Sequence, residues 1–180
     1  PWGYEYTIYR NFNHLSITLL KINYKQKTSL HCHPNKKTGF IVVDGKALIQ
    51  LGLYAANSEY YKAPSKLMIR TGLFHSIEAV SKKGVCALEF ETPVDKKDLI
   101  RFQDEYGRQS KPYEGRDFVK KTKSKYIKFK KPVFGQNQSY KIGKVKIFLE
   151  VHRNFKKMIN KNDQTIFAIL NGRIIDSSGR

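Results

Sequence analysis

Short runs of β-branched and aromatic residues, each followed by a turn signal, fill the first 95 residues of the chain. Several runs alternate apolar and polar side chains, as in Tyr4–Ile8 and Cys86–Phe90, which is the period of a half-buried β-strand. Among the turn signals, Asp44-Gly45 is typical of a hairpin. Short strands at this spacing predict an all-β fold, either a sandwich or a barrel. The predicted strands are Tyr4–Tyr9, Leu15–Tyr24, Thr38–Val43, Lys46–Tyr54, Lys66–Ile69 and Val85–Glu91.

One helix is predicted after these strands, over Asp95–Tyr106. Asp95 is a good N-cap, Leu99 and Phe102 fall on one helical face, and Gly107 can end the helix. Strand character then resumes at Lys144–Val151, Thr165–Leu170 and Arg173–Ile175.

The C-terminal part repeats a pattern found near the N-terminus. Thr165–Ile175 and Thr38–Ile49 each contain a β-run, then Asn-Gly or Asp-Gly, then a second β-run. The match is either an internal repeat or a coincidence between two hairpins. If it is a repeat, a second β-unit is present in part. It has only His152 where the first unit has His31 and His33, so we expect it to bind no metal.

The charge divides the chain. Lys and Arg number 34 and Asp and Glu 15, a net charge of +19, of which residues 1–117 hold +6 and residues 118–180 hold +13. The excess begins in the run Lys120–Lys131, which is either a phosphate-binding patch or a solvated connector. The run has no arginine and only Tyr126 and Phe129 for base stacking, so we favour a connector and expect no nucleic-acid partner. We predict a domain over 1–115, a Lys-rich connector over 116–132 and a partial second unit, similar to the first, over 133–180.

The remaining composition limits the class of protein. Hydrophobic residues make up 40% of the chain and aromatic residues 13%, enough for a core and too many for a disordered chain. No apolar run approaches the roughly 20 residues of a membrane span, and the start lacks the pattern of a signal peptide. Cys32 and Cys86 are too few for a disulfide framework, which favours a reducing, cytoplasmic location.

Three of the five histidines carry a possible chemistry. His31 and His33 are two residues apart, so on a strand both side chains lie on one face. His75 follows two strands later, after the Thr71-Gly72 turn. Three neutral imidazoles can hold a metal from one side. Cys32, between the first two, should point to the other face and pack in the core.

The motifs around these histidines resemble those of a known family. His31-Cys32-His33, followed by Thr38 and Gly45, resembles the first cupin motif, in which HxH precedes a glutamate and a glycine. Arg70–His75 resembles the second motif, PxGxxH. Together with Pro1–Gly3, Lys27–Leu30, Val42–Gly45 and Asp98–Arg108, these motifs make residues 1–110 most similar to the C-terminal domain of type II mannose-6-phosphate isomerase/mannose-1-phosphate guanylyltransferase.

This resemblance implies a double-stranded β-helix, the cupin jelly-roll barrel, with a divalent metal at its mouth. The isomerase ligand positions are occupied by His31, His33, Thr38 and His75, so the carboxylate ligand is lost at Thr38. Three histidines suit zinc best, with iron, manganese, nickel or copper as alternatives. An empty, decayed site is the other interpretation.

The resemblance also implies a reaction, aldose–ketose isomerisation of a sugar phosphate or activated sugar. The reaction needs a base near the carbon and a cation on the oxygens. Glu89 or Glu91 can be the base, and we assign Glu89. Arg101 is assigned to catalysis beside it, and Arg108 and Thr38 to substrate binding. Alternatively, the two arginines form salt bridges with Asp98 or Asp104.

Other functions stay open. One is a metal-independent nucleotide-sugar epimerase, with His75 or His31 as base and a tyrosine as acid. Another is a non-catalytic sugar-binding or assembly cupin, which Thr38 favours. We expect a small sugar or sugar phosphate as ligand, a homodimer and no membrane partner. No DNA- or RNA-binding motif supports a nucleic-acid function.

Overall fold

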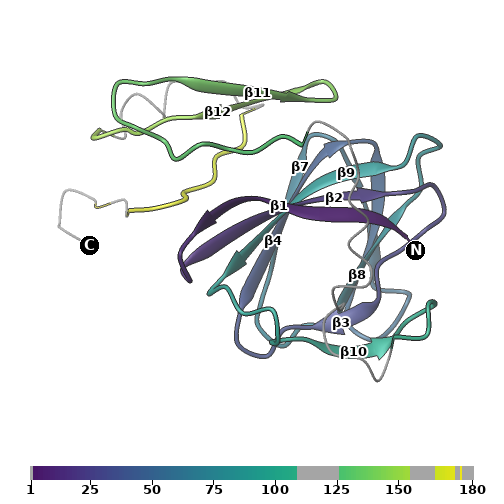
Figure 1. Ribbon diagram of the computed structural model, residues 1–180. Coiled ribbons are helices and arrows are strands. Elements are labelled where there is room, and N and C mark those ends of the chain that lie inside the picture. The colour runs from purple at the N-terminus through teal and green to yellow at the C-terminus, as the bar shows by residue number, and fades with distance from the viewer. Residues whose placement is uncertain (1, 109–125, 155–164, 173–174, 176–180) are drawn as a thin grey trace.

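The computed structural model describes residues 2–108, 126–154, 165–172 and 175, and within them it is all-β, as predicted (Figure 1). It contains twelve strands, and none of the described residues forms a helix long and apolar enough to cross a membrane. The strands are β1 (Gly3–Asn11), β2 (Leu15–Ile22), β3 (Leu30–Cys32), β4 (Lys37–Asp44), β5 (Lys46–Leu51), β6 (Ser58–Lys62), β7 (Ser65–Ile69), β8 (His75–Ala79), β9 (Val85–Thr92), β10 (Ile100–Gln103), β11 (Gln138–Ile142) and β12 (Val145–Leu149).

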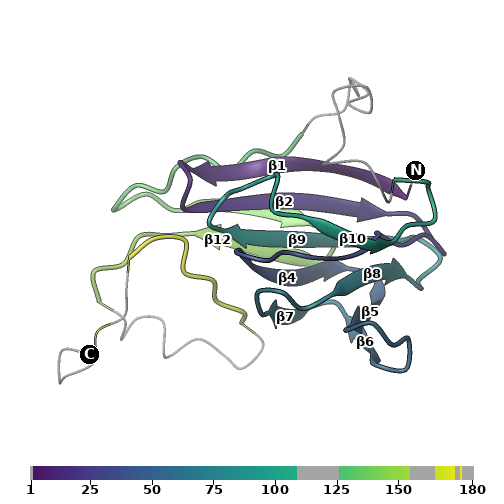
Figure 2. The same ribbon diagram turned by 90° about the horizontal axis from the view of Figure 1, so that it is seen from below.

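Two five-stranded antiparallel sheets form the body of residues 2–108, which we call the barrel. The first sheet has the order β1-β2-β9-β4-β7 and the second the order β10-β3-β8-β5-β6. Figure 2 shows the strands of the first sheet lying side by side. The chain crosses from one sheet to the other between β4 and β5 at Asp44-Gly45. The predicted hairpin there is therefore wrong, because these two strands belong to different sheets.

Strand alternation separates an inner from an outer face in the first sheet. In β9, Val85 and Ala87 point between the sheets and pack with residues of the second sheet such as Ile49 and Ile77. Glu89 and Glu91 continue the same inner face toward one end of the barrel. The interior is thus apolar at one end and polar at the other.

The outer face of the first sheet is covered by a second region. We call residues 126–154 and 165–172 the C-terminal unit. Its β11–β12 hairpin stands apart from both sheets, and Phe129, Ile142 and Leu149 pack on the outer side chains of the first sheet. Figure 1 shows this hairpin on the side of the barrel away from β3 and β10.

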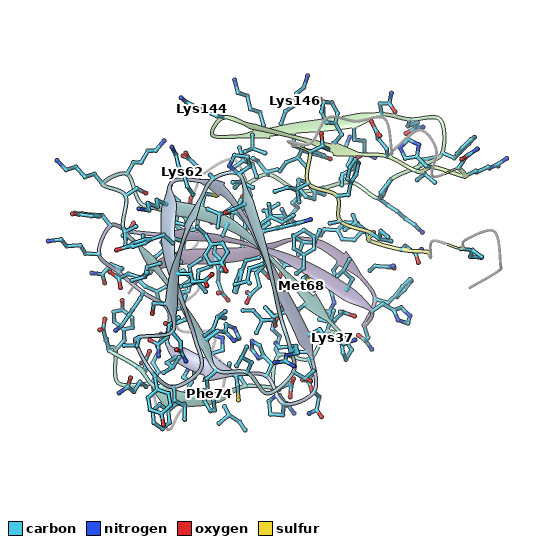
Figure 3. All side chains as sticks on the ribbon, turned by 180° about the vertical axis from the view of Figure 1, so that it is seen from behind. Lys37, Lys62, Met68, Phe74, Lys144 and Lys146 are labelled. Atoms are coloured by element: carbon cyan, nitrogen blue, oxygen red, sulfur yellow. The ribbon has the colours of Figure 1, made fainter. Side chains whose placement is uncertain are left out.

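A cleft of about 1850 Å³ lies between the C-terminal unit and the outer face of the first sheet. Its walls include Val43 and Leu88 from the sheet and Ile147 from the hairpin. Lys62, Lys144 and Lys146 are exposed at its rim, together at one end of the molecule in Figure 3.

The predicted helix over Asp95–Tyr106 is wrong. Asp95 does cap a turn, since its Oδ1 accepts the backbone N–H of Lys97, but the turn does not continue as a helix. Instead Ile100–Gln103 forms β10, which pairs with β3. Backbone hydrogen bonds to the open edge of the second sheet replace those of an isolated helix, which would be marginal at this length.

The predicted strand over Thr165–Leu170 is also absent, since these residues belong to none of the strands in the described structure. Of the prediction over Arg173–Ile175, two residues lie outside the described ones, as does most of the Lys-rich connector. Strands β3, β6, β8 and β11 were not among the predicted strands.

Candidate metal centre

The three predicted histidines converge at the polar end of the barrel interior. His31 lies in β3, His33 follows that strand directly, and His75 begins β8, where it is the register partner of His31. Their ring centroids are 4.5 to 5.3 Å apart. One nitrogen from each ring can be chosen so that all three lie within 4.8 Å of one another. This spacing brings three donor atoms around one point, as a metal requires.

Hydrogen bonds fix the tautomer of each ring. Nδ1 of His31 lies 2.8 Å from the carbonyl oxygen of Ser29, Nδ1 of His33 2.6 Å from that of Asp98, and Nδ1 of His75 3.0 Å from that of Leu73. A carbonyl oxygen only accepts, so each Nδ1 carries the proton and each Nε2 keeps a lone pair. Among the described residues, Nε2 of His33 and Nε2 of His75 are buried without a partner. The donor set fits a divalent metal bound through Nε2.

The surroundings also keep the rings neutral. Burial lowers the pKa of His33 to about 4, and the nearby Lys36 ammonium acts in the same direction. Burial likewise lowers the pKa of His75 to about 4. Burial and the two other histidines hold the pKa of His31 well below its usual value. Neutral imidazole is the form that binds metal.

A buried ion-pair network lies beside the histidines. Glu91 accepts hydrogen bonds from Lys36, from Lys96 at 3.1 Å and from the Ser16 hydroxyl at 3.0 Å. Glu91 and Lys36 are each 3% exposed. Although burial acts to raise it, the two ammonium groups lower the pKa of Glu91 to about 2. Glu91 is therefore a fixed anion, and both of its carboxylate oxygens accept hydrogen bonds.

Glu89 is the other carboxyl group on this inner face. It lines the same cavity as His31 and His33. Burial, with the neighbouring Glu91 and Glu5 charges, raises its pKa to about 8. It accepts or releases a proton near neutral pH, as a general acid or base must. Of the two glutamates, Glu89, to which the sequence analysis assigns the role of base, is thus the one whose pKa lies near neutral pH.

The predicted arginines lie at the same cavity. Arg101 in β10 pairs with His31 in register, and both Arg101 and Arg108 line the cavity wall. Arg108 is 5% exposed, and its guanidinium binds Asp104, with the shortest contact at 2.7 Å. The predicted Asp104–Arg108 salt bridge is therefore present, in a turn rather than on a helix.

Thr38 lies on the inner face of β4, next to Glu91 of β9 in register. It is 1% exposed, and its hydroxyl has no partner among the described residues. The position that holds a carboxylate in the isomerase motif thus carries a hydroxyl here, and the neighbouring carboxylate of Glu91 is bound by Lys36 and Lys96 instead.

Sequence reasoning missed Lys36, Lys96 and Ser16 as parts of this site. Lysines are common in the chain, and nothing local marks Lys36 as buried or Lys96 as half-buried in the same ion-pair network. Strand alternation could have pointed to Ser16, since it shares an inner face with Leu20 and Ile22.

Comparisons with known proteins agree with this architecture. No family model matches the sequence, and no curated protein matches it significantly. Among solved structures, a conserved protein with a double-stranded β-helix domain from Klebsiella pneumoniae matches with a TM-score of 0.51 and 14% identity, over 57% of this chain and 85% of its own. The fold is that of the cupins. The capsular polysaccharide assembling protein CapF from Staphylococcus aureus matches with a TM-score of 0.51 and 16% identity, over 57% of this chain and 32% of CapF. At these identities the likeness concerns the fold alone.

Proposed function

We propose that this protein is a metal-dependent cupin that acts on a sugar phosphate or an activated sugar, by isomerisation like that of mannose-6-phosphate isomerase. The observation that carries the proposal is the set of three neutral histidines, in which one nitrogen of each ring lies within 4.8 Å of the others. Support for a sugar comes from the motif resemblance, and CapF, which shares the fold, is a capsular polysaccharide assembling protein.

The residues around the cavity suit such a reaction. A bound divalent metal would polarise the carbonyl and hydroxyl oxygens of an open-chain sugar. Glu89 would take a proton from one carbon and return it to the next, which its raised pKa permits. Glu91 stays ionised and keeps the Glu89 pKa high by its charge. Arg101 and Arg108 would contribute positive charge for a phosphate or an oxyanion.

The metal is tested by elemental analysis of the purified protein. We expect about one zinc, iron, manganese or nickel ion per chain, lost in His33→Ala and retained in the exposed control His14→Ala. A wild-type protein that holds no metal after loading with each ion contradicts the proposal.

The reaction is tested by exchange of solvent deuterium into aldose and ketose phosphates. We expect exchange with wild-type protein, a loss of 100-fold or more in Glu89→Gln, and little change in the exposed control Glu59→Gln.

A second candidate function is non-catalytic sugar binding. Thr38 favours it, since the metal would lack the anionic ligand of the isomerase motif. Metal binding with saturable sugar affinity but no exchange in any sugar phosphate would support this function over isomerisation.

Cytoplasmic location and a homodimer belong to the same proposal. The two cysteines, Cys32 and Cys86, are buried and free, which suits a reducing compartment.

The C-terminal unit exposes three large apolar side chains, Phe148, Phe167 and Ile169, and a second copy would cover them. Light scattering at several concentrations distinguishes a dimer from a monomer.

A further inference from the structure

The three histidines are oriented in two different ways. Nδ1 of His31 binds the carbonyl oxygen of Ser29, and Nδ1 of His75 binds that of Leu73, in each case two residues earlier in the chain. Nδ1 of His33 instead binds the carbonyl oxygen of Asp98, 65 residues away. Two rings are thus oriented locally, and the third depends on a contact with the connection that leads into β10.

The side chain of Asp98 is what holds this connection in place. Its carboxylate accepts the backbone N–H of Asn35 at 3.1 Å, the Asn35 side-chain amide at 2.9 Å and the backbone N–H of Lys36 at 2.8 Å. Asp98 is 6% exposed, so water does not replace these bonds easily. The carboxylate of Asp98 closes the turn after His33, while the backbone carbonyl oxygen of Asp98 accepts the hydrogen bond from Nδ1 of His33.

A second contact ties the same two segments together. The Lys36 ammonium donates to the carbonyl oxygen of Asp95 at 3.1 Å and also binds Glu91. Residues 95–98 are therefore fastened to residues 33–36 at both ends. The carbonyl oxygen that accepts the hydrogen bond from His33 belongs to this fastened segment.

We propose that Asp98 is a positioning residue of the metal centre, whose carboxylate holds residues 95–98 against the turn after His33 and so aims the Nε2 atom of His33 at the metal. Removing a group that hydrogen-bonds to a metal-ligating side chain and orients it commonly weakens metal affinity by about 10- to 100-fold. Because linkage is reciprocal, a bound metal must also stabilise the connection between β9 and β10. The proposal rests on the proposed function only for the presence of a metal, not for the reaction.

The first part of the test is the affinity for Co²⁺, titrated into the metal-free full chain and followed by its visible absorption. We expect Asp98→Ala to weaken binding about 10- to 100-fold. Asp98→Asn keeps the size of the side chain and one of its two acceptor oxygens. It should therefore lose less Co²⁺ affinity than Asp98→Ala. Asp95→Asn is the matched control: it changes the same charge on the same connection, at an exposed side chain that does not touch His33 or its turn. Its affinity should stay within about 2-fold of wild type.

The second part needs no substitution. Hydrogen exchange of the wild-type protein should slow at residues 98–103 when Co²⁺ is bound, more than at β6, which is remote from the histidines in the second sheet. This measurement decides the matter if Asp98→Ala does not fold.

Unchanged Co²⁺ affinity in folded Asp98→Ala or Asp98→Asn overturns the proposal, as does an equal loss in Asp95→Asn or no metal effect on exchange at 98–103. A wild-type protein without Co²⁺ affinity removes the proposed function as well. Normal affinity in the Asp98 variants with intact solvent exchange into sugar removes this proposal alone.

Discussion

The barrel and the C-terminal unit contain similar strand-like sequence, yet their segments are paired very differently. Residues 38–44, within β4, lie between β7 and β9 and are hydrogen-bonded on both sides. The corresponding segment Thr165–Leu170 is not part of any sheet in the described structure. The adjoining β11–β12 hairpin has two strands only.

This difference shows that a strand needs neighbours more than it needs a favourable composition. A two-stranded hairpin is marginal alone, and it becomes stable by packing on another layer. The hairpin does so through Ile142 and Leu149, on the outer face of the first sheet. The barrel instead encloses its own core, with Ile22, Val85 and Ala47 fully buried. We therefore expect the barrel to tolerate damage to the C-terminal unit, and not the reverse.

The largest effect is expected from Ile77→Ala in the barrel. Ile77 is 1% exposed and packs between the two sheets, so the variant leaves a cavity that should reduce the free energy of unfolding by about 2–5 kcal/mol. Trp2 is the only tryptophan and lies in the same core, so its fluorescence follows the barrel in urea unfolding.

The matched control is Phe148→Ala on β12, a side chain that is 49% exposed. It should leave the Trp2 transition within about 0.5 kcal/mol of wild type. Equal losses of the free energy of unfolding in the two variants would mean that the barrel and the C-terminal unit unfold as one body.

The sequence predicted the barrel well and the C-terminal unit poorly, for a physical reason. The inner strands β2, β4 and β9 carry strong apolar patterns because both of their faces are buried, one between the sheets and one under the C-terminal unit. Strand β10 has only four residues and is mostly exposed, and only its pairing with β3 makes it a strand. Such pairing depends on residues about 70 positions away, which no local pattern contains.

The cluster of three histidines could be predicted because its members lie in motifs with fixed spacing, His31-Cys32-His33 and Arg70–His75. What surrounds them could not. Lys36, Lys96 and Asp98 reach the site from two loops. Asp98 contacts His33, 65 residues away, and Lys36 contacts Glu91, 55 residues away. Lys96 binds the same Glu91 carboxylate as Lys36. The opposite pKa shifts of Glu89 and Glu91 likewise depend on the positions of those lysines.

Metal should stabilise the barrel and not the C-terminal unit. A ligand that binds only the folded state at 100 times its Kd adds about 2.7 kcal/mol to the free energy of unfolding. We expect Co²⁺ to shift the Trp2 transition by that amount and hydrogen exchange of β11 and β12 to stay unchanged. His33→Ala should show no shift. Slower exchange across the hairpin on metal addition would show that the two regions are coupled.

Acid should weaken the metal-free barrel through Glu91. Its pKa is about 2 in the folded protein against 4.5 ordinarily, so its contribution is complete above pH 4.5 and is lost as the pH falls toward 2. One such group gives a slope of up to about 1.4 kcal/mol per pH unit. Urea unfolding followed by Trp2 at several pH values between 2 and 5 measures it, and Glu91→Gln should flatten this part of the slope. Glu89, with its pKa raised to about 8, acts with the opposite sign between pH 4.5 and 8. An unchanged slope in folded Glu91→Gln would mean that other groups cause the acid loss.

The smallest effect is expected at Thr38, where the barrel carries a buried hydroxyl without a partner among the described residues. Thr38→Val keeps the shape and removes the unpaired group, so it should raise the free energy of unfolding of the metal-free protein by about 1 kcal/mol. Thr38→Ser keeps the hydroxyl and loses a methyl group, so it should be less stable than wild type. If Thr38 binds substrate, Thr38→Val also loses sugar affinity while Co²⁺ affinity is unchanged. A Thr38→Val protein less stable than wild type would mean that the hydroxyl has a partner. A bound water shared with Glu91 or Thr18 would be the first candidate, because Glu91 and Thr18 lie on the inner faces of adjacent strands.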